Sequence, residues 1–396
     1  MLISQEPFLN FQTETVAMAR VLITGGAGFI GRRLASRLLA SGHQVRILDP
    51  LTQQVHGAVP QDVGWLQEPD IEFMRGSVVN RQDWIAALKD VDCVAHLAAE
   101  TGTGQSMYEV ARYNEVNSQG TALLFDVLAQ DDRRSVKRII LTSSRSIYGE
   151  GRYECRSCGL APVYPSSRSA SQLSEHKWEP TCPNCGSNLH VVATKESDTP
   201  RPASIYAATK YAQEDLVRVG CEALGIGYAI FRLQNVYGEG QSLKNPYTGI
   251  LSIFSTKLRR GLELPLFEDG LESRDFVHVD DVVSALVLGI DAPMPPDDTF
   301  NVGSGVATSI AEVAGALSTA FGKVHNTVIT GQYRIGDIRH NVADMSLIRS
   351  KLGFEPSIDL QAGLKRFAQW VLTQPLPEDL LAKANKELQD RSLMGS

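Results

Sequence analysis

The feature that most constrains the fold is a glycine-rich turn that joins a short apolar run to a helical pattern near the start of the chain. Residues 21–31 read Val-Leu-Ile-Thr-Gly-Gly-Ala-Gly-Phe-Ile-Gly, with Gly25, Gly28 and Gly31 spaced as G-x-x-G-x-x-G. Such glycines let the backbone approach a phosphate group and aim the N-terminus of the following helix at its negative charge. Asp49 ends the next apolar run, where a carboxylate can bind a ribose. The pattern predicts a βαβ unit that binds a dinucleotide pyrophosphate rather than a turn that binds nothing.

Apolar, strand-like runs alternate with helical periodicity through the first 150 residues, which is typical of a parallel sheet covered on both faces. The expected strands are at 21–24, 45–49, 71–74, 93–97, 139–143 and 228–233, and the expected helices are at 29–40, 81–89, 117–129 and 206–224. We therefore predict an α/β protein. Its core is a Rossmann-type, doubly wound parallel sheet, joined to a smaller α+β cap and carrying an inserted segment that resembles a zinc ribbon.

At 396 residues the chain is long enough for two domains. We expect the whole length to divide into a disordered extension, an interrupted dinucleotide-binding domain with an insertion, a cap, and a charged tail that frays. The expected bounds are 1–18 for the extension, 19–233 and 275–303 for the dinucleotide-binding domain, 150–204 for the insertion, 234–274 and 304–375 for the cap, and 376–396 for the tail.

The composition excludes several classes of partner. The net charge is −7, from 38 basic and 45 acidic residues, which argues against a nucleic-acid-binding surface. No apolar run approaches the roughly 18 residues that a membrane span needs, and residues 1–17 lack the basic start of a secretory signal. We expect a cytoplasmic protein that binds neither nucleic acid nor membrane. An anionic small molecule would need well-placed arginines to hold it against the negative field.

Asp49 favours NAD over NADP, because a carboxylate can accept hydrogen bonds from both ribose hydroxyls and repels a 2′-phosphate. Arg32 and Arg33 leave NADP open as the alternative. Other residues expected along the cofactor lie in the glycine-rich turn, at strand ends or at the start of a helix. They are Phe29, Ile30, Ser77, Val78, Leu97, Ala98, Ala99 and Asn117.

Tyr206 and Lys210 lie four residues apart on a predicted helix, and therefore on one face of it. An unperturbed tyrosine has a pKa of about 10 and is a poor base at neutral pH. A lysine ammonium one turn away and a positive nicotinamide ring would lower the pKa of Tyr206. Ser144 ends the fifth strand and can hydrogen-bond the same substrate oxygen, and Asn117 can hold Lys210 through a water. The set predicts proton transfer coupled to hydride transfer at an alcohol carbon, with Tyr206 and Lys210 also touching the cofactor.

The order of these motifs resembles the extended short-chain dehydrogenase/reductase family, specifically its NAD-dependent nucleotide-sugar epimerases and dehydratases. The likeness covers residues 19–370, with the 150–204 insertion as the main departure. The resemblance implies that Ser144, Tyr206 and Lys210 are catalytic. It also implies a homodimer that pairs the helices at 117–129 and 206–224 with their copies. The residues that it implies as contacts of a sugar-nucleotide diphosphate are Asn235, Arg274 and Arg334.

Dehydratases of this family carry Asp-Glu directly after the catalytic Ser or Thr, whereas this chain has Arg145 and Ser146. Elimination therefore lacks its acid/base pair, and 4-epimerisation is expected. A 4-ketosugar reductase that consumes NAD(P)H and a non-catalytic dinucleotide sensor remain as alternatives. The segments 99–106, 232–252 and 268–276 are similar to a group that interconverts dTDP-L-rhamnose and dTDP-6-deoxy-L-talose. This implies a dTDP-sugar substrate, with Thr101 and Ser146 as further contacts.

The insertion contains two Cys-x-x-Cys pairs, Cys155/Cys158 and Cys182/Cys185, each followed by a glycine. Four thiolates suit a closed tetrahedral zinc site, although the 23 intervening residues slightly exceed the usual spacing. In a reducing compartment, two disulfides or unligated thiols are the poorer interpretations. The pattern predicts structural zinc, and we expect this segment to act as a lid over the substrate or as a contact between subunits.

Overall fold

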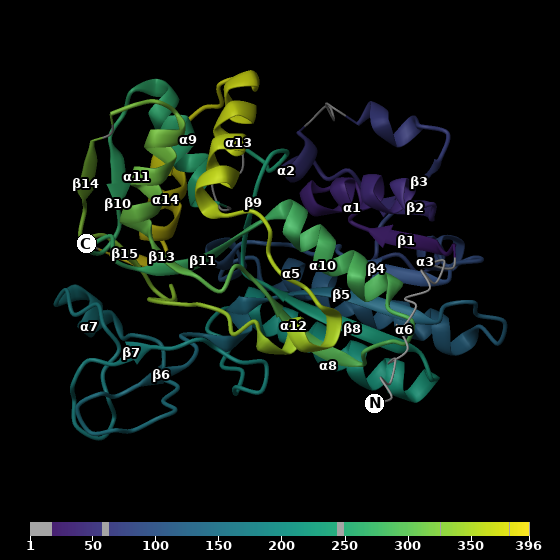
Figure 1. Ribbon diagram of the computed structural model, residues 1–396, viewed down its shortest axis with the longest axis horizontal. Coiled ribbons are helices and arrows are strands. Elements are labelled where there is room, and N and C mark those ends of the chain that lie inside the picture. Colours follow the sequence, from purple (N-terminus) through teal and green to yellow (C-terminus); the bar gives the residue numbers. More distant parts are fainter. Residues whose placement is uncertain (1–17, 58–62, 244–248, 325, 380, 396) are drawn as a thin grey trace, which may run out of the picture.

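The computed structural model describes residues 18–57, 63–243, 249–324, 326–379 and 381–395. The expected disordered extension, at residues 1–17, lies outside these residues. Within them, seven strands form one sheet in the order β12-β8-β5-β4-β1-β2-β3 (Figure 1). Every neighbouring pair is parallel, which confirms the predicted doubly wound sheet. The strands are β1 (Arg20–Thr24), β2 (Gln44–Asp49), β3 (Ile71–Arg75), β4 (Cys93–His96), β5 (Arg138–Ser144), β8 (Gly227–Leu233) and β12 (Asp298–Val302).

Helices cover both faces of this sheet because successive strand residues point to opposite sides. Val21 and Ile23 of β1 pack into the core on one face, whereas Leu22 packs into the core on the other. One face carries α1 (Phe29–Ala40), α10 (Val279–Asp291) and α12 (Ser346–Leu352), and the opposite face carries α3 (Arg81–Ala87), α6 (Gly120–Gln130) and α8 (Ile205–Leu224).

The cap has an apolar core of its own, in which Phe254, Leu317 and Phe367 are buried together. Three helices and two small sheets surround that core, and Figure 1 shows them above the end of the main sheet. The helices are α9 (Ile250–Arg260), α11 (Ile310–Ala320) and α13 (Leu360–Thr373). The strands are β9 (Asn235–Tyr237), β11 (Ser273–His278) and β13 (Ala307–Ser309) in one sheet and β10 (Leu264–Leu266) and β14 (Thr327–Ile329) in the other.

Two segments depart from the expected division into domains. β11 pairs with β9 and β13 in a small sheet that belongs to both domains, because Phe276 is buried in the cap core whereas Val277 is buried in the core under the main sheet. α12 falls within the expected cap segment 304–375, yet Met345 and Ile348 are buried in the core under the main sheet. In both segments, the apolar side chains decide against which core the segment packs.

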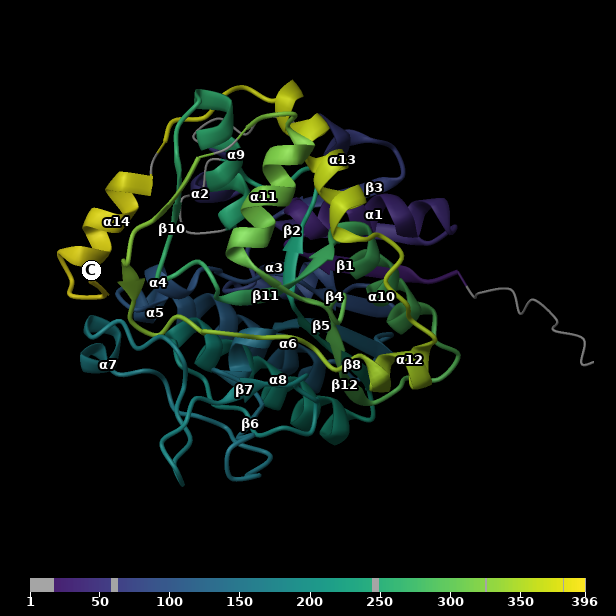
Figure 2. The same ribbon diagram turned by 60° about the vertical axis from the view of Figure 1, so that its left-hand side comes forward.

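The C-terminal segment, which was expected to fray, is packed against the rest of the protein. It forms α14 (Leu381–Gln389) and β16 (Met394–Gly395), and β16 pairs with β15 (Tyr333–Arg334). Leu388 and Met394 are buried. Figure 2 shows α14 at the edge of the cap, above α4 (Thr103–Ser106) of the main domain. The tail therefore touches both domains.

The insertion lies below the cap, beside the end of the main sheet (Figure 1). It contains β6 (Tyr153–Glu154), α7 (Ala170–Ser174) and β7 (His190–Val191). None of the helices that the structure describes is both long and apolar enough to cross a bilayer. The remaining short elements are α2 (Gln53–His56), η1 (Gly64–Gln67), α5 (Val110–Tyr113), η2 (Asn114–Gln119) and η3 (Arg145–Tyr148).

Candidate active site

A cavity of about 640 Å³ opens at the carboxyl ends of the parallel strands, where α/β sheets bind ligands. The glycine-rich turn, the ends of β2, β4 and β5, and α8 form its walls, and its volume suits a cofactor. Most of the residues expected to bind the dinucleotide or to react line this cavity. They are Gly25, Gly28, Phe29, Ile30, Gly31, Asp49, Ser77, Val78, Leu97, Ala98, Ala99, Ser144, Tyr206 and Lys210, together with the expected substrate residues Thr101, Ser146 and Asn235.

The turn before α1 and the first turn of α1 each need glycine at one position. Gly25 has φ 68, and a Cβ there would lie 2.9 Å from the backbone of Ala98. A Cβ on Gly31 would lie 2.6 Å from the carbonyl oxygen of Gly25. Gly28 precedes α1 and gives it no side-chain cap, so the N–H groups of the first turn are free of a side-chain acceptor. This end of α1 can therefore receive an anion.

Asp49 is buried at the end of β2 and is held by the backbone. Its carboxylate accepts the N–H of Ala27 at 3.1 Å and the N–H of Leu51 at 2.8 Å. Burial raises the pKa of Asp49, and the hydrogen bond from Leu51 opposes this. Arg33 is paired with Asp280 at 2.6 Å. The Arg32 guanidinium lies 5.3 Å from the centre of the Trp65 ring. Neither arginine is among the described residues that line the cavity, which favours NAD over NADP.

Tyr206 and Lys210 project from α8. Ser204 caps the N-terminus of this helix, and its side chain accepts the N–H of Ala207. The Lys210 ammonium is buried and donates a hydrogen bond to the Thr142 carbonyl at 2.9 Å. Burial lowers the pKa of Lys210 to about 7. The tyrosine, the serine and the lysine that we expected to be catalytic therefore meet at one wall of the cavity.

The lowering of the Tyr206 pKa by Lys210 and the nicotinamide ring stays a prediction for the cofactor-bound protein. Burial raises the pKa of Tyr206, and a hydrogen bond with Ser144 and the charge of Arg145 act in the opposite direction. Ser144 is itself held in place, because the Ser146 hydroxyl donates to its Oγ at 3.0 Å. Arg145 is a nearby cation that favours the phenolate.

Asn117 does not line the cavity, although we expected it beside the cofactor. It is fully buried, and its Oδ1 accepts the Glu100 N–H at 2.8 Å. Its Nδ2 donates to the Glu100 carbonyl at 3.1 Å and to Thr209 Oγ1 at 3.0 Å. Asn117 thus ties the loop after β4 to α8, one residue before Lys210.

A second cavity, of about 200 Å³, lies between the cap and the main domain. It is lined by Asn235, Arg274 and Arg334, the residues that we expected to bind the diphosphate. Arg145 and Asn235 line both cavities. Arg145 Nη1, Arg334 Nε and Asn235 Oδ1 are buried without a hydrogen-bond partner among the described residues. Such groups are costly unless something pairs with them, so the second cavity is built for a ligand rich in hydrogen-bonding oxygens.

The comparisons with known proteins agree with this geometry. The model of the NAD dependent epimerase/dehydratase family matches residues 21–171 and 181–303. The dTDP-L-rhamnose 4-epimerase of Burkholderia thailandensis is 38% identical over 355 residues, which cover 89% of this chain and 94% of that relative. The chain belongs to the NAD-dependent epimerase/dehydratase family. The resemblance seen in the sequence is confirmed at this level.

Solved structures of this family include more than one reaction type. The UDP-glucose 4-epimerase of Thermotoga maritima, solved with UDP-glucose, has a TM-score of 0.70 at 27% identity, covering 89% of this chain and 98% of that one. The dTDP-glucose 4,6-dehydratase of Streptomyces venezuelae, solved with NAD, has a TM-score of 0.70 at 25% identity, covering 89% and 96%. The residues of the site must therefore distinguish epimerisation from dehydration.

Three residues that line the second cavity were not expected from the sequence as family site residues. In the sequence, Arg145 marks a position that lacks the dehydratase acid, and its place directly after the strand-end Ser144 is the signal that could have identified it. Glu268 and Glu272 also line the cavity. No local pattern singles them out, because the segment that contains them is distinguished only by its likeness to a group of this family.

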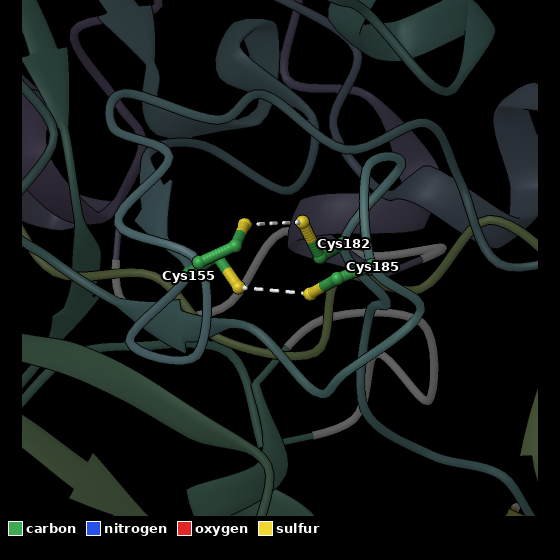
Figure 3. A group of neighbouring side chains, drawn as sticks. Cys155, Cys182 and Cys185 are labelled. Carbon is green, nitrogen blue, oxygen red and sulfur yellow. Dashed lines mark hydrogen bonds between the residues drawn. The ribbon is translucent and has the colours of Figure 1, made fainter.

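The four cysteines of the insertion come together in one cluster (Figure 3). Their sulfurs all lie within 4.8 Å of one another, and Cys155 Sγ is 3.5 Å from Cys185 Sγ. Cys158 Sγ is 3.7 Å from Cys182 Sγ. A tetrahedral zinc with Zn–S bonds of 2.3 Å requires sulfurs about 3.8 Å apart. The glycine after each pair has a positive φ, and its N–H donates to the first cysteine's carbonyl at 2.9 Å. The donor set and its spacing fit zinc.

Proposed function

We propose that this protein is an NAD-dependent nucleotide-sugar 4-epimerase. The observation that carries the proposal is the position of Ser144, Tyr206 and Lys210 at the wall of a dinucleotide-sized cavity. Arg145 and Asn235 connect that wall to a second cavity lined by arginines. A sugar whose diphosphate is held in the second cavity would present its C4 hydroxyl to the first.

NAD bound in the first cavity would supply the acceptor and then the donor of the C4 hydride. Tyr206 takes the proton of the 4-hydroxyl as the hydride leaves and returns it when the hydride comes back to the opposite face of the sugar. Ser144 binds the same oxygen and hydrogen-bonds Tyr206. One proton and one hydride leave the substrate and both return, so the product is an isomer.

Dehydration and net reduction are less well supported. Arg145 and Ser146 occupy the positions where elimination would need an acid and a base, and Ser146 is engaged with Ser144. A 4-ketosugar reductase would have to exchange its cofactor in every turnover. A non-catalytic dinucleotide sensor has no need of Tyr206 and Lys210, which the cavity presents together.

For the substrate we propose dTDP-L-rhamnose, converted to dTDP-6-deoxy-L-talose. Support comes from the 38% identity to the Burkholderia enzyme and from the sequence segments that resemble the same group. Arg145, Arg274 and Arg334 bring three guanidinium groups to the second cavity, and such groups bind phosphate oxygens with paired hydrogen bonds. They offset the net negative charge of the protein at this site.

The test is a panel of dTDP-, UDP- and GDP-sugars incubated without added cofactor and followed by proton NMR. Inversion at C4 is expected, with dTDP-L-rhamnose converted fastest. Deuterium placed at C4 should remain in the product, because the hydride returns to the carbon that lost it. Stoichiometric consumption of added NADH would favour the reductase, and loss of the deuterium to water would contradict the mechanism.

We also propose that the cysteine cluster binds one structural zinc ion. The sulfur spacing supports zinc over two disulfides, whose S–S bonds are about 2.05 Å. Purified protein should contain one zinc per chain by elemental mass spectrometry, and replacing Cys155 and Cys158 by Ser should remove it. Full zinc content in that double variant would contradict the proposal.

The proposed assembly is a homodimer formed by α6 and α8. These helices lie side by side on one face of the sheet. Val219 is exposed and Leu123 and Leu216 are partly exposed, so apolar surface remains for a second copy. Light scattering should give twice the mass of the chain, and Val219→Glu should shift the mass toward one chain. A monomeric wild-type protein would contradict this assembly.

A further inference from the structure

The insertion reaches the wall of the second cavity through buried charges and an aromatic contact. We propose that Arg168 and Trp178 of the insertion are positioning residues that hold this wall, so that the four-cysteine cluster controls the affinity for the sugar nucleotide but not for the dinucleotide. This inference rests on the proposed function, since it concerns the same substrate cavity.

Arg168 is the first link between the insertion and the cavity. Its side chain is 1% exposed, and its guanidinium donates to Glu268 Oε2 at 2.8 Å and to the Asp337 carbonyl at 3.0 Å. Both Glu268 and Asp337 line the second cavity. Glu268 has φ 49, a backbone conformation that costs energy for a residue other than glycine. Arg168 therefore helps to hold Glu268 in a conformation that it would not adopt by itself.

Arg339 of the cap forms the second link. It is also 1% exposed, and its Nε donates to Glu179 of the insertion at 2.8 Å. Its Nη1 donates to Glu268 at 2.9 Å, and its backbone N–H donates to Glu150 at 2.8 Å. Glu268 thus lies between two buried arginines, one from each segment. Removing one member of such a network leaves other buried charges unpaired.

Aromatic rings form the third link. Trp178 lies between His176, at 5.0 Å between ring centres, and Tyr333, at 6.2 Å. Tyr333 lines the second cavity and directly precedes Arg334, the expected diphosphate contact. The Trp178 carbonyl also accepts a hydrogen bond from Arg168 at 3.1 Å. The indole therefore supports the strand that presents Arg334.

The insertion depends on its cysteines because its own core is small. That core contains Tyr153, Val163 and Leu189 with only two further buried residues, Cys155 and Cys182. So small an apolar core cannot order a segment of this length by itself, and metal ligation is the usual remedy. Trp178 and Glu179 lie just before Cys182 in the chain, so loss of the cluster would release both of them.

Dinucleotide binding in the first cavity serves as an internal control for sugar-nucleotide binding in the second. Of the described residues that line it, none belongs to the insertion. Damage to the insertion should therefore weaken sugar-nucleotide binding and leave dinucleotide binding unchanged. A general loss of folding would affect both.

The deciding variant is Trp178→Leu, because the indole is only partly buried and no charge is stranded by its loss. Arg168→Lys is the second variant, since it keeps the charge and loses the planar fork of donors. The matched control is Arg156→Ala, an insertion arginine whose side chain is 66% exposed. The cysteine double variant Cys155→Ser/Cys158→Ser tests the cluster itself.

Five quantities are measured on each purified protein: metal content, NAD retained per chain, the dissociation constant for dTDP by calorimetry, and KM and kcat for the sugar nucleotide. Trp178→Leu should keep its metal and NAD, and its dissociation constant and KM should rise roughly three- to tenfold with kcat nearly unchanged. Arg168→Lys should behave similarly, the cysteine variant should lose metal and dTDP affinity together, and Arg156→Ala should match wild type.

Unchanged dTDP affinity in Trp178→Leu and in the metal-free cysteine variant would overturn the inference. An equal loss of NAD and dTDP in Trp178→Leu would also overturn it, because that result means general damage. If the cysteine variant does not fold, Trp178→Leu and Arg168→Lys decide the question. Failure of the proposed function looks different: wild-type protein would then bind neither dTDP nor any sugar nucleotide of the panel.

Discussion

The two cavities of this protein are built in different ways. The dinucleotide cavity is formed by consecutive strand ends of one parallel sheet and by the turn between β1 and α1. The second cavity draws on η3, β9, α9, the segment before β11, β15 and the C-terminal segment, which are far apart in the chain. A site on one sheet is positioned by local geometry, whereas a site between domains is positioned by every contact that holds those domains together.

The electrostatics differ as well. Next to the dinucleotide cavity, burial lowers the pKa of Lys210 to about 7 and raises that of Tyr206. In the second cavity, Arg145 is a buried guanidinium near Arg274, and burial lowers its pKa to about 9. Glu272 faces the same space, and its Oε2 lies 3.9 Å from Arg339 Nη1 without a hydrogen-bond partner among the described residues. The first region is organised for moving a proton, and the second for holding charge.

The largest effect is expected from Tyr206→Phe, which removes the proposed proton carrier and leaves the shape of both cavities. The value of kcat should fall by about 10²–10⁴-fold, the usual contribution of a positioned acid/base group. NAD content and the affinity for dTDP should stay close to wild type, as measured by absorbance of released cofactor and by calorimetry. Normal turnover in this variant would remove Tyr206 from the mechanism.

Arg145→Met should weaken ligand binding in the second cavity and leave NAD binding in the first cavity unchanged. Hydrogen bonds to charged groups contribute about 1.5–3 kcal/mol, so the affinity for dTDP should fall by roughly 10–100-fold. NAD retained after purification should not change, because the glycine-rich turn and Asp49, which are expected to hold NAD, are unaltered. Arg133→Met, which alters an exposed arginine, is the control. A matching loss of NAD would mean that the cavities are not energetically distinct.

The smallest effect concerns the pH dependence of stability. Burial raises the pKa of Glu272 to about 7, whereas an unfolded glutamate titrates near 4.3. Between about pH 4.3 and pH 7, Glu272 therefore carries a proton in the folded protein that it lacks in the unfolded chain. The stability contributed by neutral Glu272 is lost as the pH rises through about 7. Glu272→Gln should unfold like wild type near pH 4.5 and be more stable at pH 8, by on the order of 1–3 kcal/mol. Thermal melts at both pH values measure this, and equal differences at both would contradict the assignment.

The sequence predicted most of the site in the main domain and less of the site in the cap. Gly25 follows a strand, Asp49 and Ser144 end strands, and Tyr206 and Lys210 lie on a helix. The apolar pattern of each of these elements is clear in the sequence, and parallel strands bring their ends to one edge. For Asn117, the helix was expected but its partners were not, because hydrogen bonds to Glu100 and Thr209 join parts of the chain that no local pattern connects.

The same limit applies to the domain boundaries and the tail. α12 looked like part of the cap because it lies between cap segments in the chain, but its apolar side chains bury against the main domain. The charged C-terminal segment was expected to fray. Its few apolar residues are enough to pack it against the rest of the protein, because Leu388 and Met394 are buried. Sequence order does not reveal which surface an amphipathic helix will cover.

The sequence by itself determined the parallel sheet, the glycine turn, the Tyr–Lys pair and the four cysteines, because each depends on residue types at short, regular spacings. Only the tertiary structure decided that Arg145 joins two cavities, and that Arg168 and Arg339 enclose Glu268 between the insertion and the cap. Those contacts join residues about 70 to 100 positions apart. Their geometry depends on how separate apolar cores pack, and no local spacing encodes it.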